Sequence, residues 1–353
     1  MSILKQNNTI GTVLNVQSSA DNSNKADIQY ILSIVSTLFG FLIAVVINRF
    51  FPQYADLKLE DYSTTLIKNI TIVEAYEIVL TGIIIFYSAI AALSFKNEVK
   101  KRKFIKQAPF RMALGIALAL WDILGTKVQV FAQPFFPGPS RIIEAFLIES
   151  DYIFENTLYS LRLYAVGFIL GVILGVGTGI LIGWFPKLNY WIFPVLKITG
   201  VIPAVAWMPF ALTLFPTPFA AAVFLIIICA WFPVAFLTSQ GITGTPKIHY
   251  EVAKTLGAKT PYLVFHVAIP HAMPQIFTGI STANGFAFTT LVMSEMMGQP
   301  GGLGYYINAS KVWSAYYKVF AAIIVMAILF SIIMTIINEI SVRILKWQRG
   351  MVK

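Results

Sequence analysis

Charged residues are scarce in this chain, and their scarcity excludes most classes of soluble protein. Asp, Glu, Lys and Arg make up 12% of the 353 residues, against roughly 25% in an ordinary soluble domain. Hydrophobic residues account for 57%, and the mean hydropathy is +0.74. Cysteine is nearly absent too: Cys229 stands alone in the sequence, so an internal disulfide is excluded. The composition predicts an all-α bundle of membrane-spanning helices.

Motifs of nucleotide-binding and catalytic sites are also missing. The sequence has no Gly-x-x-x-x-Gly-Lys-Ser/Thr phosphate loop, no His-Glu-x-x-His metal motif and no Gly-x-Ser-x-Gly nucleophile motif. The three histidines, His249, His266 and His271, are not spaced as a metal site. We therefore expect no catalytic residue, metal site or cofactor here. An ATP-driven machine built on this chain would take its ATPase, with ATP and Mg²⁺, from a partner.

Apolar runs long enough to cross about 30 Å of hydrocarbon recur along the chain. They predict about eight transmembrane helices, near 29–51, 71–95, 109–131, 158–184, 191–215, 217–239, 271–297 and 318–345. The fifth run is the least regular, because Pro194, Pro203 and Pro209 interrupt it.

Positive charge is concentrated in alternate connections between these runs, at 96–111, 187, 247–259 and 343–353. The intervening connections carry acidic residues instead: Asp56, Glu60, Asp61, Glu144, Glu149, Asp151 and Glu155. Because basic loops stay in the cytoplasm, this pattern places both termini there. The net charge of +10 thus reflects membrane orientation, and we expect lipid but no nucleic acid among the partners.

The basic run near 96–108 suggests a domain boundary. Residues 1–28 are predicted to be a disordered, polar cytoplasmic tail, and 29–108 a two-span extension with a basic cytoplasmic connection. Residues 109–353 would form a six-span core that contains the motifs described below.

A polar segment at 245–258 lies between the sixth and seventh runs, on the cytoplasmic side. Thr245 is expected to cap a short helix with Pro246 at its first position, and Gly257 to end that helix in the left-handed conformation. Apolar residues recur every four positions along one face: Ile248, Val252 and Leu256. The pattern predicts an amphipathic helix that docks on another protein.

The segment from Glu251 to Gly279 closely resembles the EAA loop of ABC importer permeases. The matching residues are Glu251, Ala253, Gly257, Ala258, Phe265, Val267, Ile269, Pro270, Ala272, Pro274, Ile276 and Gly279, while Val252 replaces the usual Ala. The resemblance implies a coupling loop at 245–279, whose helix 246–258 rests in a groove of the ATPase subunit. Its contacts would come from Ile248, Glu251, Val252, Ala253, Leu256, Gly257 and Ala258. The alternative is an ordinary amphipathic surface helix.

Further motifs, spread over roughly residues 109–350, indicate which group of ABC importer permeases the chain resembles. They are Phe136–Ser140, Ser160–Arg162, Pro203–Pro209, Glu295 and Gly301–Tyr305. In this order they resemble type I, binding-protein-dependent permeases of the nitrate, sulfonate, taurine and bicarbonate importer group. Two N-terminal spans depart from the six-span pattern of that group.

This resemblance implies a bacterial inner or plasma membrane protein that imports a small anionic solute. Its partners would be ABC ATPase subunits, an extracellular or periplasmic solute-binding protein, and a second permease chain, either identical or related. Import of a vitamin or vitamin precursor is an alternative.

Polar residues inside the apolar runs are candidates for the solute pathway or a gate. They are Asp122, Asn284, Thr289, Thr290 and Glu295. The alternative role for Asp122 is to pair with a side chain of a neighbouring helix. The alternative roles for Glu295 are to cap a helix or to form a structural pair with another side chain.

A glycine stripe recurs every four residues in the fourth run: Gly167, Gly171, Gly175, Gly179 and Gly183. One face of small residues predicts close packing against another helix, either beside the pore or subunit interface or within the general membrane packing.

Two other classes of function fit the sequence less well. An ion-driven secondary transporter would need paired intramembrane carboxylates or broken helices in inverted repeats, and Asp122 alone is thin support. An intramembrane enzyme would need a nucleophile, base or metal set at one depth, and no such set can be assembled from the sequence.

Overall fold

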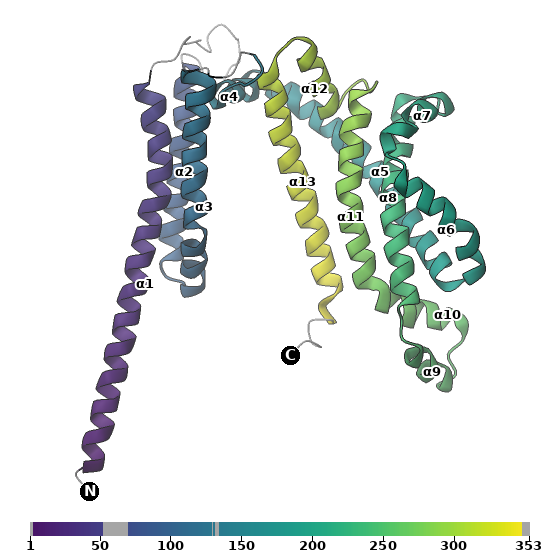
Figure 1. Ribbon diagram of the computed structural model, residues 1–353, viewed down its shortest axis with the longest axis horizontal. Helices are drawn as coiled ribbons and strands as arrows, with labels where there is room; N and C mark the ends of the chain where they lie inside the picture. Colours follow the sequence, from purple (N-terminus) through teal and green to yellow (C-terminus); the bar gives the residue numbers. More distant parts are fainter. Residues whose placement is uncertain (1–2, 52–69, 129, 131–133, 348–353) are drawn as a thin grey trace. The chain divides into compact units, whose positions relative to one another are not determined.

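The computed structural model describes the backbone of residues 3–51, 70–128, 130 and 134–347, and side chains from Asp27 onward. Every element in this part of the chain is a helix, which confirms the all-α prediction. The longer helices are α1 (Ile3–Phe50), α2 (Ile72–Ser94), α3 (Glu98–Asp122), α5 (Ser150–Trp184), α6 (Pro186–Val201), α8 (Pro218–Thr243), α11 (Ile269–Met296) and α13 (Tyr316–Ile344). The shorter ones are α4 (Pro139–Ile148), α7 (Met208–Leu214), α9 (Lys247–Thr255), α10 (Thr260–Tyr262) and α12 (Leu303–Val312) (Figure 1).

Seven helical segments in the described residues are long and apolar enough to cross a membrane, or eight if a bent helix pair is counted as one span. Each segment overlaps a predicted apolar run, but the segments Glu98–Lys127, Ser150–Trp184 and Thr260–Met296 begin earlier than predicted. The bent pair is the fifth run: Pro186–Val201 and Ala204–Leu214 meet at an angle of 102°. Ile202, at the break, has an extended backbone with ψ of 121°. The ring of Pro203 disfavours the helical conformation at the preceding residue, which explains the break.

The chain packs as two compact units, Met1–Ile148 and Glu149–Lys353. The first contains α1 to α4, and its buried side chains join α1, α2 and α3: Phe41, Ala44, Tyr76, Leu80 and Ala119. Gly40 of α1 lies against the backbone of α3, since a Cβ at Gly40 would lie 2.6 Å from the carbonyl oxygen of Met112. Small residues therefore let these two helices meet at backbone distance.

Two expectations for the first unit are corrected. The segment 3–28, expected to be a disordered tail, is helical, because α1 begins at Ile3 and runs on into the first span. The basic run, expected to be a connection, belongs to α3. Asn97 caps that helix, since its Oδ1 accepts the N–H groups of Val99 at 3.0 Å and Lys100 at 3.3 Å.

The division between the units also differs from the boundary expected near 96–108, because α3 packs along α1 and stays in the first unit. That the transport core starts at residue 109 stays a prediction. The acidic residues Asp56, Glu60 and Asp61 lie outside the described residues.

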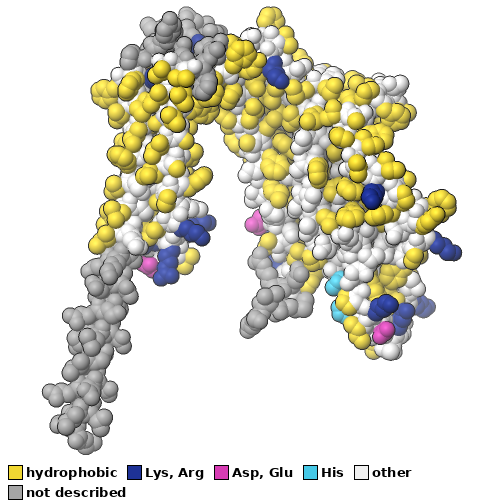
Figure 2. Space-filling model, in the orientation of Figure 1, with side chains coloured by type: hydrophobic (Ala, Val, Ile, Leu, Met, Phe, Trp, Pro, Cys, Tyr) yellow, Lys and Arg dark blue, Asp and Glu magenta, His cyan; other side chains and the backbone are white. Residues whose placement is uncertain are grey.

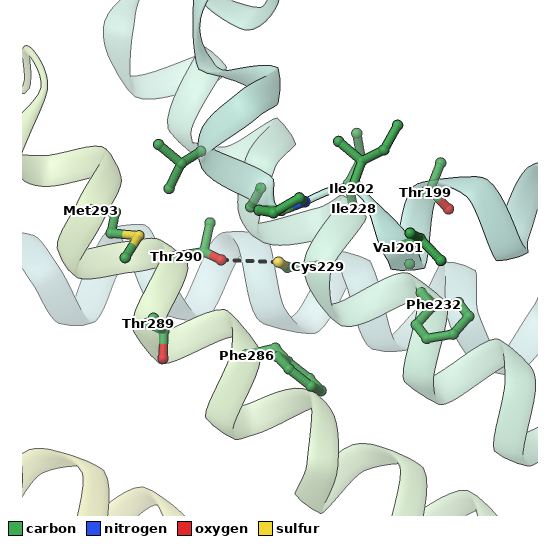
Figure 3. Close-up of a pocket in the computed structure, with 14 residues that line it drawn as sticks. Thr199, Val201, Ile202, Ile228, Cys229, Phe232, Phe286, Thr289, Thr290 and Met293 are labelled. Atoms are coloured by element: carbon green, nitrogen blue, oxygen red, sulfur yellow. Dashed lines mark hydrogen bonds between the residues drawn. The ribbon is translucent and has the colours of Figure 1, made fainter.

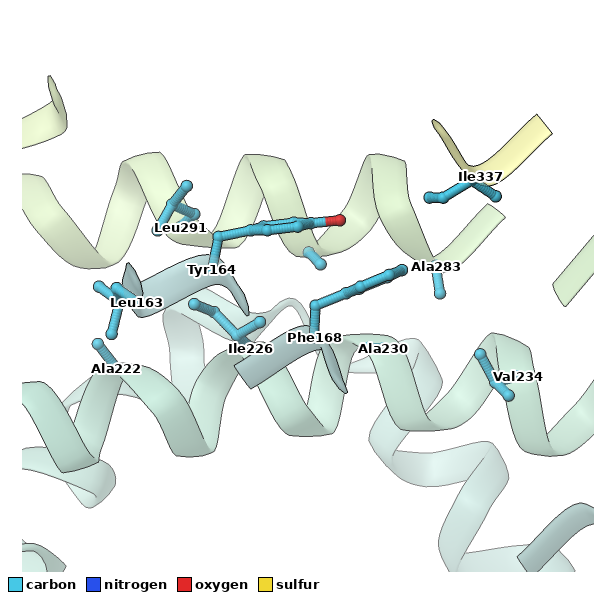
Figure 4. Packing of buried hydrophobic residues seen from close by; sticks show 11 residues of the cluster. Leu163, Tyr164, Phe168, Ala222, Ile226, Ala230, Val234, Ala283, Leu291 and Ile337 are labelled. Atoms are coloured by element: carbon cyan, nitrogen blue, oxygen red, sulfur yellow. The ribbon is translucent and has the colours of Figure 1, made fainter. Parts of the chain in front are cut away.

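The second unit is built around α5, α8 and α11. A cluster of buried side chains at its centre is drawn in Figure 4 and includes Leu163, Tyr164, Ile226, Val234 and Leu291. The ring of Tyr164 stacks on Phe168 at 5.0 Å between centroids, and its hydroxyl donates to Oδ1 of Asn284. The core is thus largely apolar, and this hydrogen bond is a buried polar contact between α5 and α11.

The glycine stripe of α5 faces α8 along its whole length. A Cβ at Gly171 would lie 2.7 Å from Ala230 Cβ, and one at Gly175 would lie 2.6 Å from Val234 Cβ. The three other glycines, Gly167, Gly179 and Gly183, meet Ile226, Thr238 and Ile242 in the same way. Each step of four residues on α5 matches a step of four on α8, so the helices run in the same direction. Larger residues at these glycines would force them apart.

Candidate functional site: a docking helix and a cavity at the broken span

Helix α9 lies at one end of the second unit, between α8 and α10 (Figure 1). Its C-terminus is closed by two backbone hydrogen bonds, from Gly257 N–H to Lys254 O at 2.9 Å and from Ala258 N–H to Ala253 O at 3.0 Å. Gly257 has a φ of +83°, as this type of helix end requires. The glycine thus turns the chain sharply toward α10.

The start of α9 differs from the prediction. Pro246 precedes the first helical residue, and Thr245 makes no capping bond. The hydroxyl of Thr245 is buried and donates back to Gly241 O, at 3.4 Å. The predicted cap was wrong because an acceptor in the preceding helix α8 lies within reach of the hydroxyl.

The apolar stripe of α9 is open to solvent in the isolated chain. Ile248, Val252 and Leu256 are 57%, 53% and 83% exposed. Glu251 is exposed beside them, whereas Ala253 and Ala258 are half-buried. Three large apolar side chains in line on a polar helix are costly to hydrate, and such a patch is typical of a docking surface.

The opposite face of α9 is held by aromatic packing. The half-buried ring of Tyr250 meets Trp184, the last residue of α5, edge-on at 5.6 Å between centroids. Tyr250 also packs against buried Ile242, Ala268 and Ala272. Helix α9 is therefore tied to the ends of α5, α8 and α11 while its apolar stripe stays free.

The histidines do not form one group. His249 and His271 face each other at 5.8 Å between ring centroids, whereas His266 stacks on Tyr262 at 4.3 Å. Between α10 and α11 the backbone widens to a π-helix over Leu263–Ala268. Pro270 follows directly, and its ring would clash with the carbonyl of His266 in a regular helix, which accounts for the wider turn.

A second feature is a cavity of about 480 Å³ at the break in the fifth span. Its walls come from the end of α6, the segment 201–205, α8 and α11 (Figure 3). Cys229, Phe232, Phe286 and Met293 give it an apolar and partly aromatic lining. The polar lining side chains are Thr199, Thr289 and Thr290, and Thr290 Oγ1 donates to Cys229 Sγ at 2.9 Å. No lining residue carries a charge.

The predicted pathway residues do not come together. Of the five, only Thr289 and Thr290 line the cavity. Asn284 is buried between Tyr164 and Met334. Its Oδ1 accepts the hydroxyl of Tyr164, and its Nδ2 donates to the sulfur of Met334 at 3.7 Å. Asp122 lies fully buried in the first unit, near Thr126 and Lys127, and neither carboxylate oxygen accepts a well-formed hydrogen bond from the part of the chain that the structure describes.

Glu295 holds a loop at the opposite end of the second unit from α9. Its Oε2 accepts the N–H of Gly304 at 2.8 Å, at the start of α12. Two side chains of α5 support the same loop, because Asn156 accepts the N–H of Gly302 at 2.9 Å and Ser160 that of Leu303 at 2.8 Å. This geometry matches the capping alternative for Glu295.

Helix α12 is secured further along by Tyr306. Its hydroxyl donates to Oε2 of Glu149 at 2.7 Å, and Lys318 donates to the same carboxylate. Burial, together with this bond to Glu149, raises the pKa of Tyr306 above its usual range. The loop and helix at this end therefore form a rigid surface.

Sequence reasoning missed the cavity residues Phe232, Phe286 and Met293. The available signal was Pro203, because a broken membrane helix is tolerated where it lines a cavity.

Comparison with known proteins agrees with the resemblance to ABC importer permeases that the sequence motifs indicate. Residues 167–346 match the family described as the binding-protein-dependent transport system inner membrane component. A Bacillus subtilis (strain 168) protein named as the aliphatic sulfonates transport permease SsuC is 32% identical over 67% of this chain and 86% of its own. The nitrate import permease NrtB of Synechococcus elongatus is 28% identical over 62% of this chain and 80% of its own.

Among solved structures, an inward-facing MetNI methionine ABC transporter has a TM-score of 0.49 at 19% identity, covering 56% of this chain and 97% of that one. The sequence relatives include permeases named for bicarbonate and taurine as well. The chain therefore belongs to the binding-protein-dependent transport system inner membrane components, as a multi-pass ABC importer permease related to those for sulfonate, nitrate, bicarbonate and taurine.

Proposed function

We propose that α9 is the coupling helix of this permease, and that it transmits the movement of separate ATPase subunits to the membrane helices. The observation that carries the proposal is the pairing of an exposed stripe, Ile248, Val252 and Leu256, with an opposite face anchored by Tyr250. A helix that transmits movement between two proteins needs one face that is free to bind the partner and an opposite face that is packed against its own chain. ATP and Mg²⁺ would bind the partner, and this chain would contribute no catalytic residue.

We infer that α9 and both termini lie in the cytoplasm. Lys247, Lys254 and Lys259 are exposed around α9, which favours the cytoplasmic side. Helix α9 and the end of α13 also lie at the same end of the second unit (Figure 1). The inner or plasma membrane of a bacterial cell would be the location.

The opposite end of the second unit would receive a solute-binding protein. The loop at 300–304 and α12 offer a surface fixed by hydrogen bonds, which suits repeated docking of a rigid partner. The cavity at the broken span would face a second permease chain, identical or related, so that two chains enclose one pathway. Reversible closure of that pathway would give alternating access.

The solute is proposed to be a small anion with an organic part, such as an alkyl sulfonate or taurine. The names of the relatives support an anion. The cavity adds an uncharged lining in which Phe232 and Phe286 offer apolar surface and Thr289 and Thr290 offer hydroxyls. The same lining supports a vitamin or vitamin precursor as the second candidate, and it suits nitrate or bicarbonate less well.

The coupling proposal is tested by purifying the permease with its ATPase. Val252→Asp and Leu256→Glu place charge in the apolar stripe without touching the core, since both side chains are exposed. We expect the complex to dissociate and solute-stimulated ATP hydrolysis to fall at least tenfold. Lys254→Gln, on the same helix but off the stripe, is the control and should assemble normally. Normal assembly of both stripe variants would refute the proposal.

Orientation is tested by cysteine labelling in a Cys229→Ser background. Lys254→Cys at α9 should react with a membrane-impermeant maleimide only in inverted vesicles. Trp313 is exposed at the end of α12, and Trp313→Cys should react only in right-side-out spheroplasts. The reverse pattern would overturn the topology.

A further inference from the structure

The end of α3 at which the helix begins carries a dense group of exposed cations. Within eleven residues the exposed ones are Lys96, Lys100, Arg102, Lys103 and Lys106. Figure 2 shows Lys and Arg side chains gathered at this end of the first unit. None of the five forms an ion pair within the described residues. The nearest acidic side chain on α3, Glu98, is already engaged with Lys101 at 3.7 Å.

Two further cations of the same segment turn inward and contact other side chains there. Lys101 is buried and pairs with Asp27 of α1. The guanidinium of Arg111 donates to Gln107 at 2.8 Å and lies over the rings of Phe104 and Tyr87, at 4.3 and 4.9 Å. The inward face therefore fixes the rotation of α3 against its neighbours. The five outward cations cannot turn into the protein to find partners.

The cations are interleaved with exposed apolar side chains. Val99 and Phe110 lie on the same face as Lys103 and Lys106, and they are 78% and 74% exposed. Phe95 is exposed just before the helix. An acidic protein or a nucleic acid would leave these rings and the valine in water, whereas a membrane surface accepts both kinds of side chain.

The spacing along the helix matches the layers of a membrane. At 1.5 Å per residue, Lys106 lies about 6 Å and Lys103 about 10 Å along the axis from Phe110. The headgroup region on one side of a bilayer is about 5–8 Å thick. With Phe110 at the edge of the hydrocarbon, Lys106 reaches the phosphates, and Lys103 and Lys100 follow within one or two turns. Because the segment is a helix continuous with the span, its cations are held at these depths.

We propose that this basic face binds anionic phospholipid headgroups at the membrane surface where α3 begins, and that it thereby anchors the first unit in the bilayer. Attraction between phosphates and clustered Lys and Arg supplies the affinity, and the apolar side chains between them supply a membrane preference. The proposal concerns a unit that neither α9 nor the cavity belongs to. The lipid proposal can therefore fail while the coupling proposal holds, and the coupling proposal can fail while the lipid proposal holds.

The test uses the full-length permease in nanodiscs of phosphatidylcholine with 0 to 50% phosphatidylglycerol. Native mass spectrometry of the released protein counts the lipids that remain bound. We expect selective retention of phosphatidylglycerol, weakened at high salt. In Lys103→Gln/Lys106→Gln, the apparent affinity should fall about fivefold for each cation removed.

Two controls isolate the effect of charge at this face. Lys103→Arg/Lys106→Arg preserves the charge and should retain phosphatidylglycerol as the natural chain does. Lys187→Gln removes an exposed cation of the second unit and should have little effect. Equal retention of both lipids, or an unchanged preference in the double Gln variant, would overturn the proposal. So would tighter binding of the basic face to an acidic peptide or an oligonucleotide than to phosphatidylglycerol.

Discussion

Tyr250 packs edge-on against Trp184, with ring centroids 5.6 Å apart and an interplanar angle of 73°. This contact joins the exposed helix α9 to the last residue of α5, and α5 is packed along α8 through its glycine stripe. A force applied to α9 therefore has a short path through packed aromatic rings into two membrane-spanning helices. Ordinary surface helices do not need such an anchor.

Tyr250→Ala should uncouple the permease without unfolding it. Aromatic pairs of this geometry contribute about 0.5–1.5 kcal/mol beyond burial of area, and Tyr250 is only half-buried. We expect ATPase subunits still to bind the apolar stripe, while solute-stimulated transport in proteoliposomes falls more than ATP hydrolysis. Tyr250→Phe keeps the ring and should behave as the natural chain does. Equal transport by the Ala and Phe variants would contradict a mechanical role for the contact.

Gly257→Val should disrupt the turn after α9. Gly257 has a φ of +83°, and a built Cβ meets no atom within 4 Å, so any effect is conformational and not steric crowding. A β-branched residue in this region costs about 1–2 kcal/mol. Co-purification with the ATPase should weaken by about tenfold. Gly257→Asn should be milder, because Asn tolerates the left-handed conformation, and an Asn variant as weak as the Val variant would argue against this cause.

Gly171→Leu should destabilise the second unit, because α8 already occupies the space that the side chain needs. Even a Cβ at this position would lie 2.7 Å from that of Ala230. Forcing extra carbons into such a contact costs about 1–3 kcal/mol. The thermal midpoint of the purified permease should fall by several degrees. Gly177→Ala on the same helix meets no atom within 4 Å and is the matched control, with an unchanged midpoint expected.

The positions of the membrane spans were predictable, because hydrocarbon thickness dictates the length of each apolar run. The end of α9 was also predictable, since Gly257 is the residue that a left-handed helix end favours. The helical start of α3 could have been read from Asn97, whose side chain caps it, but the density of Lys and Arg suggested a connection instead. There the local capping signal was the better guide.

The cavity and the fate of the polar residues could not be predicted in the same way. Which of Asn284, Thr290 and Glu295 faces a cavity depends on the rotation of α11 against α5 and α8, which one sequence does not specify. Thr245 shows the same limit at short range. Its hydroxyl donates to the carbonyl of Gly241 in α8 and does not cap the start of α9. Side-chain partners are decided by packing, whereas spans are decided by composition.

Asp122→Asn should be tolerated and should not lower the stability of the fold. The carboxylate is fully buried, and neither oxygen accepts a well-formed hydrogen bond within the described residues, although Thr126 and Lys127 lie near it. Burying a carboxylate without well-formed hydrogen bonds costs free energy, and a neutral amide of the same shape costs less. A thermal midpoint equal to or above that of the natural chain is expected, with transport retained. Loss of transport with an intact fold would instead assign Asp122 a direct part in function.

Glu295→Ala should loosen the loop that begins α12, whereas Glu295→Gln should not. Oε2 of Glu295 accepts the N–H of Gly304 at 2.8 Å, and the amide oxygen of Gln can accept the same bond. Alanine leaves that buried N–H unpaired, which costs about 1–3 kcal/mol. Hydrogen exchange at Gly304 and Tyr305 should therefore rise in the Ala variant alone, and the affinity for the solute-binding protein should fall with it. A gate that depends on the charge of Glu295 would respond differently, since Gln would then impair transport as much as Ala does while exchange stayed slow.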